Sequence, residues 1–126
     1  MTVAAIGYLR IQASNTDAWM NFGTAVLGLM ESARQDAGGA RFLRMDDHPF
    51  RFMIEAGEQD VLLATGLEYR SAAHWQAACS ALDAAGHAVS PGSQEEAERR
   101  CVEAYASVND PSGNTLELYH GRKLDY

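Results

Sequence analysis

The sequence predicts an α+β domain in which one strand-helix-strand-strand-strand module is written twice. Two apolar strand patterns, at residues 3–12 and 60–69, each lead into a helical pattern. The two helical patterns carry a tryptophan at matching places, Trp19 and Trp75. Three short strand patterns follow each helix, and neither module could bury one face of its sheet alone. Packed together, two such sheets with one helix outside each would form a cupped mixed sheet around a hollow.

The first module is expected to span about residues 3–57. Asn15 follows its first strand and is expected to cap a helix, because its side chain can accept a hydrogen bond from an unpaired backbone N–H. Trp19, Phe22 and Val26 recur at helical spacing and predict the face that the helix buries. The three remaining strands are expected at residues 29–35, 40–46 and 50–57.

The second module is expected to span about residues 60–120. Ser71 is a plausible helix cap, Trp75 and Leu82 fall on one helical face, and Gly86 can end the helix in the left-handed conformation. The later strands are expected at residues 87–90, 103–109 and 115–120. The charged segment "PGSQEEAERR" between the first two of these strands favours a solvated loop or a short surface helix.

Composition limits the kind of protein. A chain of 126 residues that is 47% hydrophobic fits one globular domain, residues 1–126. A net charge of −7 argues against nucleic-acid and anionic-membrane partners, because a stripe of basic residues is missing. Cys79 and Cys101 are too few for a disulfide framework, and Arg10 and Gln12 interrupt the N-terminal apolar run before it could span a membrane. We therefore expect a cytoplasmic protein.

Two motifs carry a resemblance to a known superfamily. The paired modules, with "IGYLRI" near the start and "DPSGNTLELYHG" near the end, resemble the vicinal oxygen chelate superfamily of glyoxalases, bleomycin-resistance proteins and dioxygenases over essentially the whole chain. More narrowly, "GYLRIQASNTDAWMNFGTAVLGLMES" and "RFLRMDDHPFRFMIEAGEQD" resemble the N-terminal domain of two-domain type I extradiol dioxygenases, such as 2,3-dihydroxybiphenyl 1,2-dioxygenase. The resemblance implies the glyoxalase-like fold of that superfamily.

The resemblance also implies where a metal would be held. In the superfamily the ligands come from the first and last strands of each module, and these positions fall on Tyr8, Glu55, a residue at or near Ala64, and Glu117. Fe(II) in such enzymes is bound by two histidines and one carboxylate. Tyr8 stays protonated at neutral pH and Ala64 cannot coordinate, so both histidine positions are lost. We therefore expect no catalytic, cofactor-binding or metal-binding residue in this chain, and a structural role for Glu117.

The histidines do not replace the lost ligands. Each lies on a predicted turn, helix surface or strand end, and none is expected to be a catalytic ligand: His48, His74, His87 and His120. His120 lies nearest to the last strand, but its parity places it with Leu116 and Leu118 on the face opposite Glu117.

The function that we expect is that of the N-terminal, non-catalytic domain of an extradiol catechol dioxygenase in aromatic compound degradation. The resemblance implies that the intact enzyme uses Fe(II) and O2 and that the residues doing so lie beyond Tyr126. The expected partner is a C-terminal catalytic domain or a second copy of the chain. Whether the chain is a fragment or a complete gene product stays open, and so does whether it is an enzyme by itself.

Two alternatives stay open. One is a stand-alone, possibly dimeric protein without metal that binds a small aromatic ligand among the apolar positions Leu9, Phe42, Phe52 and Leu63. The other is a metal-dependent lyase or isomerase that uses Glu55 and Glu117 together with ligands from a partner chain.

Overall fold

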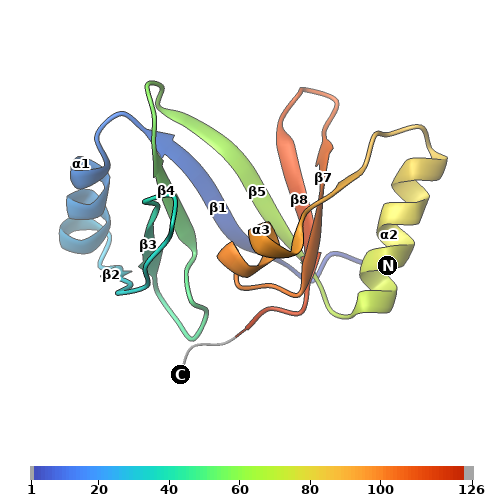
Figure 1. Ribbon diagram of the computed structural model, residues 1–126, viewed down its shortest axis with the longest axis horizontal. Helices are drawn as coiled ribbons and strands as arrows, with labels where there is room; N and C mark the ends of the chain where they lie inside the picture. The colour runs from blue at the N-terminus through green and yellow to red at the C-terminus, as the bar shows by residue number, and fades with distance from the viewer. Residues whose placement is uncertain (1, 124–126) are drawn as a thin grey trace. The chain divides into compact units, whose positions relative to one another are not determined.

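The computed structural model describes residues 2–123, which form two compact units. One unit comprises residues 8–63, and the other comprises residues 64–123 with the segment up to Gly7. The first module contains these elements: β1 (Ala5–Ala13), α1 (Thr16–Asn21), the π-helical turn η1 (Phe22–Val26), β2 (Met30–Glu31), β3 (Arg41–Arg44) and β4 (Phe52–Ala56) (Figure 1). The predicted α+β class and the order of the elements in this module are confirmed.

The strands of the first module form a mixed sheet in the order β2-β3-β4-β1. β1 and β4 are parallel, with Gln12 beside Glu55, whereas β3 is antiparallel to both of its neighbours. The predicted strand at residues 29–35 is reduced to Met30–Glu31. The sheet has one face toward α1, where the buried residues are Ile11, Ala13, Met20, Leu43 and Ile54.

The first helix begins as predicted but buries a different face. The Asn15 side chain accepts a hydrogen bond from the backbone N–H of Ala18 at 3.0 Å. The predicted stripe is nevertheless wrong beyond Trp19, because Phe22 is 45% exposed and Val26 67% exposed, while Met20 is buried. The helix widens at Phe22 into a π turn, in which residues follow one another at a smaller angle than in an α-helix. The spacing of an α-helix therefore no longer holds.

The second module contains β5 (Val61–Tyr69), α2 (Ala72–Ala84), β6 (Ser90–Pro91), α3 (Gln94–Arg99), β7 (Ala104–Asn109) and β8 (Thr115–His120). Its strands lie in the order β5-β8-β7-β6, with β5 parallel to β8 and the other pairs antiparallel. Helix α2 packs on one face of this sheet, and Trp75 donates its indole N–H to the Leu118 carbonyl at 2.7 Å. The module therefore repeats the helix-on-sheet layering of the first.

The ends of helix α2 confirm their predicted signals. Ser71 Oγ accepts a hydrogen bond from the His74 N–H at 3.1 Å, and Gly86 has a φ of 91°. After Gly86, the His87 N–H returns to the Leu82 carbonyl at 3.0 Å, so His87 completes the helix end. The strand predicted at residues 87–90 therefore starts only at Ser90.

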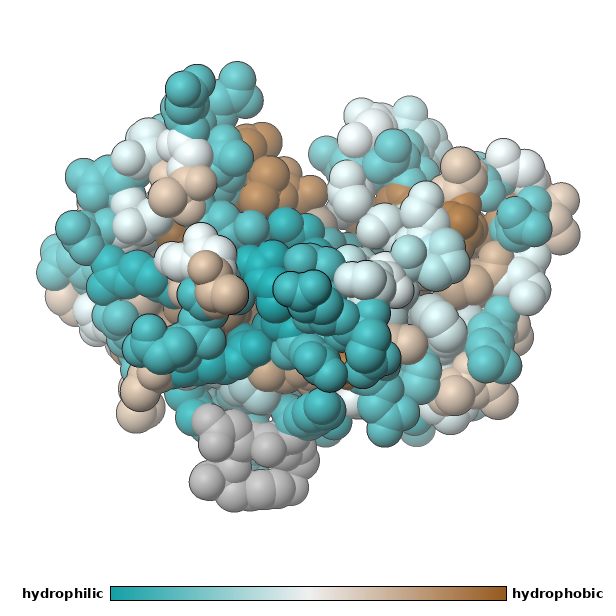
Figure 2. All heavy atoms as spheres, viewed as in Figure 1, coloured by the Kyte–Doolittle hydropathy of each residue, from teal (hydrophilic) through white to brown (hydrophobic). Residues whose placement is uncertain are grey.

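The charged segment predicted as a loop or surface helix forms α3, which Ser93 caps. Within residues 2–123, none of the helices is both long and apolar enough to cross a membrane. Figure 2 shows hydrophilic residues over much of the viewed face, with apolar residues exposed between them.

Candidate functional site

Glu117 lies in the middle of β8, which starts after a tight turn. Asp110 stabilises that turn by accepting hydrogen bonds from the N–H groups of Ser112 and Asn114 at 2.9 and 2.8 Å. The strand then alternates, so Glu117 lies on the opposite face from Leu116 and Leu118, as predicted. Its carboxylate is deeply buried, with 1% of the side chain exposed. A buried carboxylate needs partners, because its desolvation is costly.

The main partner of Glu117 is the guanidinium of Arg100, which follows α3. Arg100 Nε donates to Glu117 Oε1 at 2.6 Å, and Arg100 Nη2 donates to Glu117 Oε2 at 3.1 Å. The Arg100 side chain is only 3% exposed, and its guanidinium lies 4.2 Å from the centre of the Tyr105 ring. A two-pronged pair of this kind is among the strongest hydrogen-bonded contacts that side chains make. Both carboxylate oxygens of Glu117 are thereby engaged by a cation.

Helix α3 supplies further acceptors for Arg100. Arg100 Nη1 donates to the side chain of Glu96 at 2.8 Å and to its backbone carbonyl at 2.9 Å. The Arg100 guanidinium, helped by Arg99, holds the pKa of the Glu96 carboxyl below its ordinary value. The guanidinium is thus bracketed by two carboxylates, one buried and one near the surface. This cluster joins α3 to β8.

The end of α3 aims Arg100 at the sheet. The Val102 N–H returns to the Ala97 carbonyl at 3.1 Å and the Cys101 N–H to the Glu98 carbonyl at 3.0 Å, which is the usual pair of bonds at a helix end. Cys101 occupies the position where glycine is preferred and takes a φ of 57°. The chain therefore reverses directly after Arg100, and the guanidinium stays against the face that carries Glu117.

Glu55 also has an arginine partner, in the first module. Arg10 on β1 reaches Glu55 Oε2 from both Nε and Nη2, each at 3.0 Å. Gln12 is the residue directly beside Glu55 across the β1–β4 pair. The Gln12 amide oxygen accepts a hydrogen bond from the Gln59 N–H at 3.2 Å. Glu55 is therefore part of an ion pair at a partly exposed position.

Tyr8 and Ala64 mark the two positions where the resemblance implied lost histidines. Tyr8 is buried, and its ring packs against Phe50 with 5.5 Å between ring centres. It lies four residues before Gln12, so about 13 Å of strand separates its level in the sheet from that of Glu55. Ala64 is buried two residues before Gly66, the residue that pairs with Glu117. The structure therefore does not bring Tyr8 to Glu55.

Two of the histidines contact neighbouring side chains. His120 lies on the helix face of its sheet, with its ring 5.0 Å from that of Trp75, so its predicted parity is confirmed. His48 lies beside Asp46 and Arg51 in the loop before β4. The Arg51 guanidinium lowers the pKa of Asp46 to about 2. Across residues 2–123 the structure contains no group of three or more His, Cys, Asp or Glu side chains placed to hold a metal.

Comparison with known proteins relates this chain to extradiol dioxygenases. Residues 6–57 match the family described as "Dihydroxybiphenyl dioxygenase BphC D1". The chain is 40% identical over 126 residues to an iron-dependent extradiol dioxygenase of Rhodococcus jostii strain RHA1 and 36% identical over 121 residues to a biphenyl-2,3-diol 1,2-dioxygenase of Paraburkholderia xenovorans strain LB400. These alignments cover 100% and 96% of this chain but only 42% and 40% of the relatives.

Solved structures agree with the sequence matches. A catechol 2,3-dioxygenase superposes with a TM-score of 0.93 and 26% identity, over 99% of this chain and 44% of that one. BphC, described as a halotolerant catechol dioxygenase, superposes with a TM-score of 0.91 and 27% identity, over 98% of this chain and 41% of that one. The two βαβββ modules therefore form a domain that has the vicinal oxygen chelate fold.

Within that class, the chain is similar in sequence and in fold to the N-terminal domain of extradiol dioxygenases of the biphenyl-2,3-diol 1,2-dioxygenase type. It spans about two fifths of the length of the relatives that it matches.

The pairing of Arg100 with Glu117 could not be predicted from the sequence. The segment "QEEAERR" reads as a solvated helix, and nothing in its charge pattern separates the buried Arg100 from the neighbouring Arg99. The one available signal was Glu117 itself, because a carboxylate in the middle of an apolar strand requires a cation or several donors.

Proposed function

We propose that this chain is the non-catalytic N-terminal domain of an extradiol dioxygenase that cleaves catechols of the biphenyl-2,3-diol type. In that enzyme Fe(II) would be held by a C-terminal domain, the partner that this chain packs against. The two relatives named above support the proposal, because this chain aligns with less than half of each. We also propose a cytosolic location for this protein, supported by its two thiols outside any disulfide.

The single observation that carries the non-catalytic role is the Arg100–Glu117 pair. A divalent ion could use Glu117 only by displacing the guanidinium from both carboxylate oxygens. Breaking a buried ion pair costs about 3–5 kcal/mol, because one charge is left uncompensated. The neighbours of Glu117 across the sheet, Gly66 and Ser107, supply no imidazole. The donor set around Glu117 therefore does not fit Fe(II), and we assign the cluster the task of holding α3 on the sheet.

Iron loading tests this proposal directly. The purified chain is incubated anaerobically with Fe(II), desalted and analysed for metal, and 2,3-dihydroxybiphenyl is then added in air. We expect far less than one iron per chain and no yellow ring-cleavage product. The Arg100→Met/Glu117→Leu variant serves as the matched control and should retain the same background iron. Stoichiometric iron that is lost in this variant would overturn the proposal.

The ligand-binding alternative has less support. Leu9 and Phe52 pack against the core under α1, so two of the four apolar positions expected to line the hollow face the helix instead. Phe42 lies on the other face, where its ring packs against Phe50 at 5.0 Å. The lyase or isomerase alternative needs Glu55 and Glu117 as ligands, but each carboxylate is paired with an arginine.

A further inference from the structure

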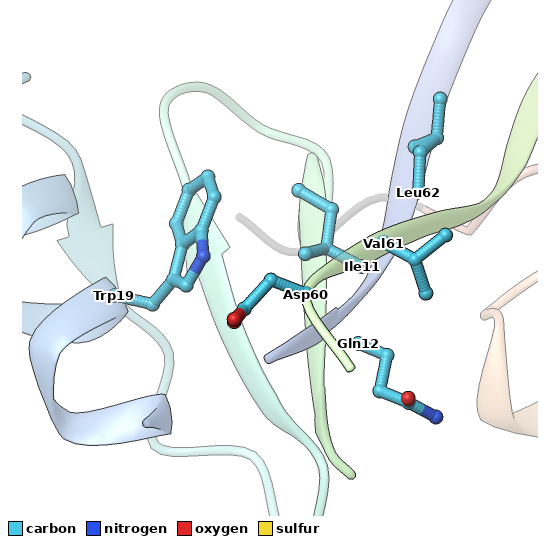
Figure 3. A pocket seen from close by; sticks show the side chains of 6 residues that line it. All are labelled: Ile11, Gln12, Trp19, Asp60, Val61 and Leu62. Atoms are coloured by element: carbon cyan, nitrogen blue, oxygen red, sulfur yellow. The ribbon is translucent and has the colours of Figure 1, made fainter. Parts of the chain in front are cut away.

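A cavity of about 290 Å³ lies in the unit of residues 8–63, beside the N-terminal end of β5. None of its lining residues belongs to the Arg100–Glu117 cluster or to the Arg10–Glu55 pair. Figure 3 shows the six side chains that line it: Ile11, Gln12, Trp19, Asp60, Val61 and Leu62. Ile11 and Trp19 belong to the helix side of the first module's sheet, whereas Gln12 lies directly beside Glu55 across the β1–β4 pair. None of the six lining residues is at a position where the superfamily resemblance implies a metal ligand.

The walls of the cavity are mainly apolar and partly open to water. Leu62 is 52% exposed and Val61 42% exposed, although both are strand residues with large apolar side chains. Trp19 contributes an aromatic ring that packs edge-on against Phe22, with 6.0 Å between ring centres. Covering apolar surface stabilises a complex by about 25 cal/mol for each Å². A cavity of this size has room for an apolar body of at least one aromatic ring, since a cavity of about 150 Å³ can hold a benzene.

One fixed carboxylate sets the charge of the cavity. Asp60 accepts hydrogen bonds from the Ser14 N–H at 2.9 Å and from the Ser14 hydroxyl at 3.1 and 3.0 Å. These bonds hold the carboxylate in place, and the backbone N–H of Ser14, followed by its hydroxyl, lowers the pKa of Asp60. In Figure 3 the Asp60 side chain lies between Trp19 on one side and Ile11 and Val61 on the other. None of the six lining residues is basic, and the whole chain carries a net charge of −7.

We propose that this cavity binds a small molecule that carries an ammonium group on an aromatic body. The ammonium would pair with Asp60 and lie against the Trp19 ring, since aromatic faces attract cations. The aromatic body would cover Ile11, Val61 and Leu62. An anion of the same shape is repelled by Asp60, and a neutral alcohol gains only a hydrogen bond. The inference does not depend on the dioxygenase assignment.

Nuclear magnetic resonance of the ¹⁵N-labelled chain can test the site with 2-phenylethylamine as the probe. The chain has two tryptophans, so its spectrum contains two indole N–H signals. The Trp75 indole is bonded to the Leu118 carbonyl at 2.7 Å in the other unit and serves as an internal control. We expect saturable movement of the Trp19 signal while the Trp75 signal stays in place.

Probe chemistry and one variant decide the outcome. At equal ionic strength, 2-phenylethanol and 3-phenylpropionate should each bind at least about threefold more weakly than 2-phenylethylamine, because an ion pair at an exposed carboxylate contributes modestly. Asp60→Asn should weaken the amine by a similar factor, whereas Asp83→Asn, in the other unit, should not. Equal affinity for all three probes, or no change in Asp60→Asn, would overturn the proposal. An unmoved Trp19 signal at 20 mM amine would do the same.

Discussion

At the scale of single residues, the decisive contact is between Arg100 and Glu117. The two side chains are 17 positions apart in the sequence, and both are almost completely buried. Desolvating two charges opposes folding, and their mutual attraction with the further bonds to Glu96 offsets that cost. The cluster therefore adds specificity to the position of α3, while its loss would leave a charge in the interior.

Removing the arginine alone should be strongly destabilising. Arg100→Ala leaves the Glu117 carboxylate buried without its cation, and we expect the free energy of unfolding to fall by about 3–5 kcal/mol. Arg100→Met combined with Glu117→Leu should recover most of the loss, because no charge then remains to be buried. Urea unfolding followed by circular dichroism measures both variants. A loss below about 1 kcal/mol in Arg100→Ala would contradict this account of the pair.

At the scale of elements, the helix caps were the features most directly predicted from the sequence. Asn15 and Ser71 cap the helices for which they were predicted, because each needs only a local hydrogen bond to a backbone N–H. The π turn after Asn21 could not be predicted from a local signal of this kind. Met20 and Gly23 are buried on either side of its start, whereas the spacing of an α-helix had placed the exposed Val26 on the buried side.

The end of α3 offers a stabilising substitution. Cys101 adopts a φ of 57°, a left-handed conformation that costs a residue with a side chain about 1 kcal/mol or more. Cys101→Gly should therefore raise the free energy of unfolding by about 0.5–1 kcal/mol, after allowance for the greater freedom of glycine in the unfolded chain. Cys79→Gly, in the interior of α2, should instead lower it by at least about 1 kcal/mol. Thermal unfolding distinguishes the two, and destabilisation by Cys101→Gly would refute the expectation.

At the scale of the whole molecule, the two modules could be predicted because their pattern is repeated. The strand-helix order, the face of Glu117 and the parity of His120 all follow from periodicity, which a single chain displays. The pairing of Arg100 with Glu117 could not be predicted, because it depends on where α3 packs. Arg10 and Glu55 are 45 positions apart in the sequence, and their ion pair could not be predicted either.

The charge of the whole chain gives a further expectation. With 17 acidic and 10 basic residues, the protein should repel polyphosphates rather than bind them. Fluorescence anisotropy of a labelled 20-base-pair DNA duplex should not change at about 0.15 M salt in the presence of excess protein. Binding that weakens steeply as salt is raised would contradict the prediction and reveal a basic surface.

The arginine beside Glu117 also constrains any attempt to redesign this domain as a metalloprotein. Installing histidines on β5 would add donors next to a carboxylate whose oxygens a side-chain cation already holds. Arg100 therefore has to be replaced before Glu117 can bind a metal together with new histidines. The space that the arginine side chain leaves then has to be filled by an apolar side chain. A redesigned metal site would therefore start from a carboxylate whose charge Arg100 already neutralises, and not from a carboxylate that is free to bind a metal.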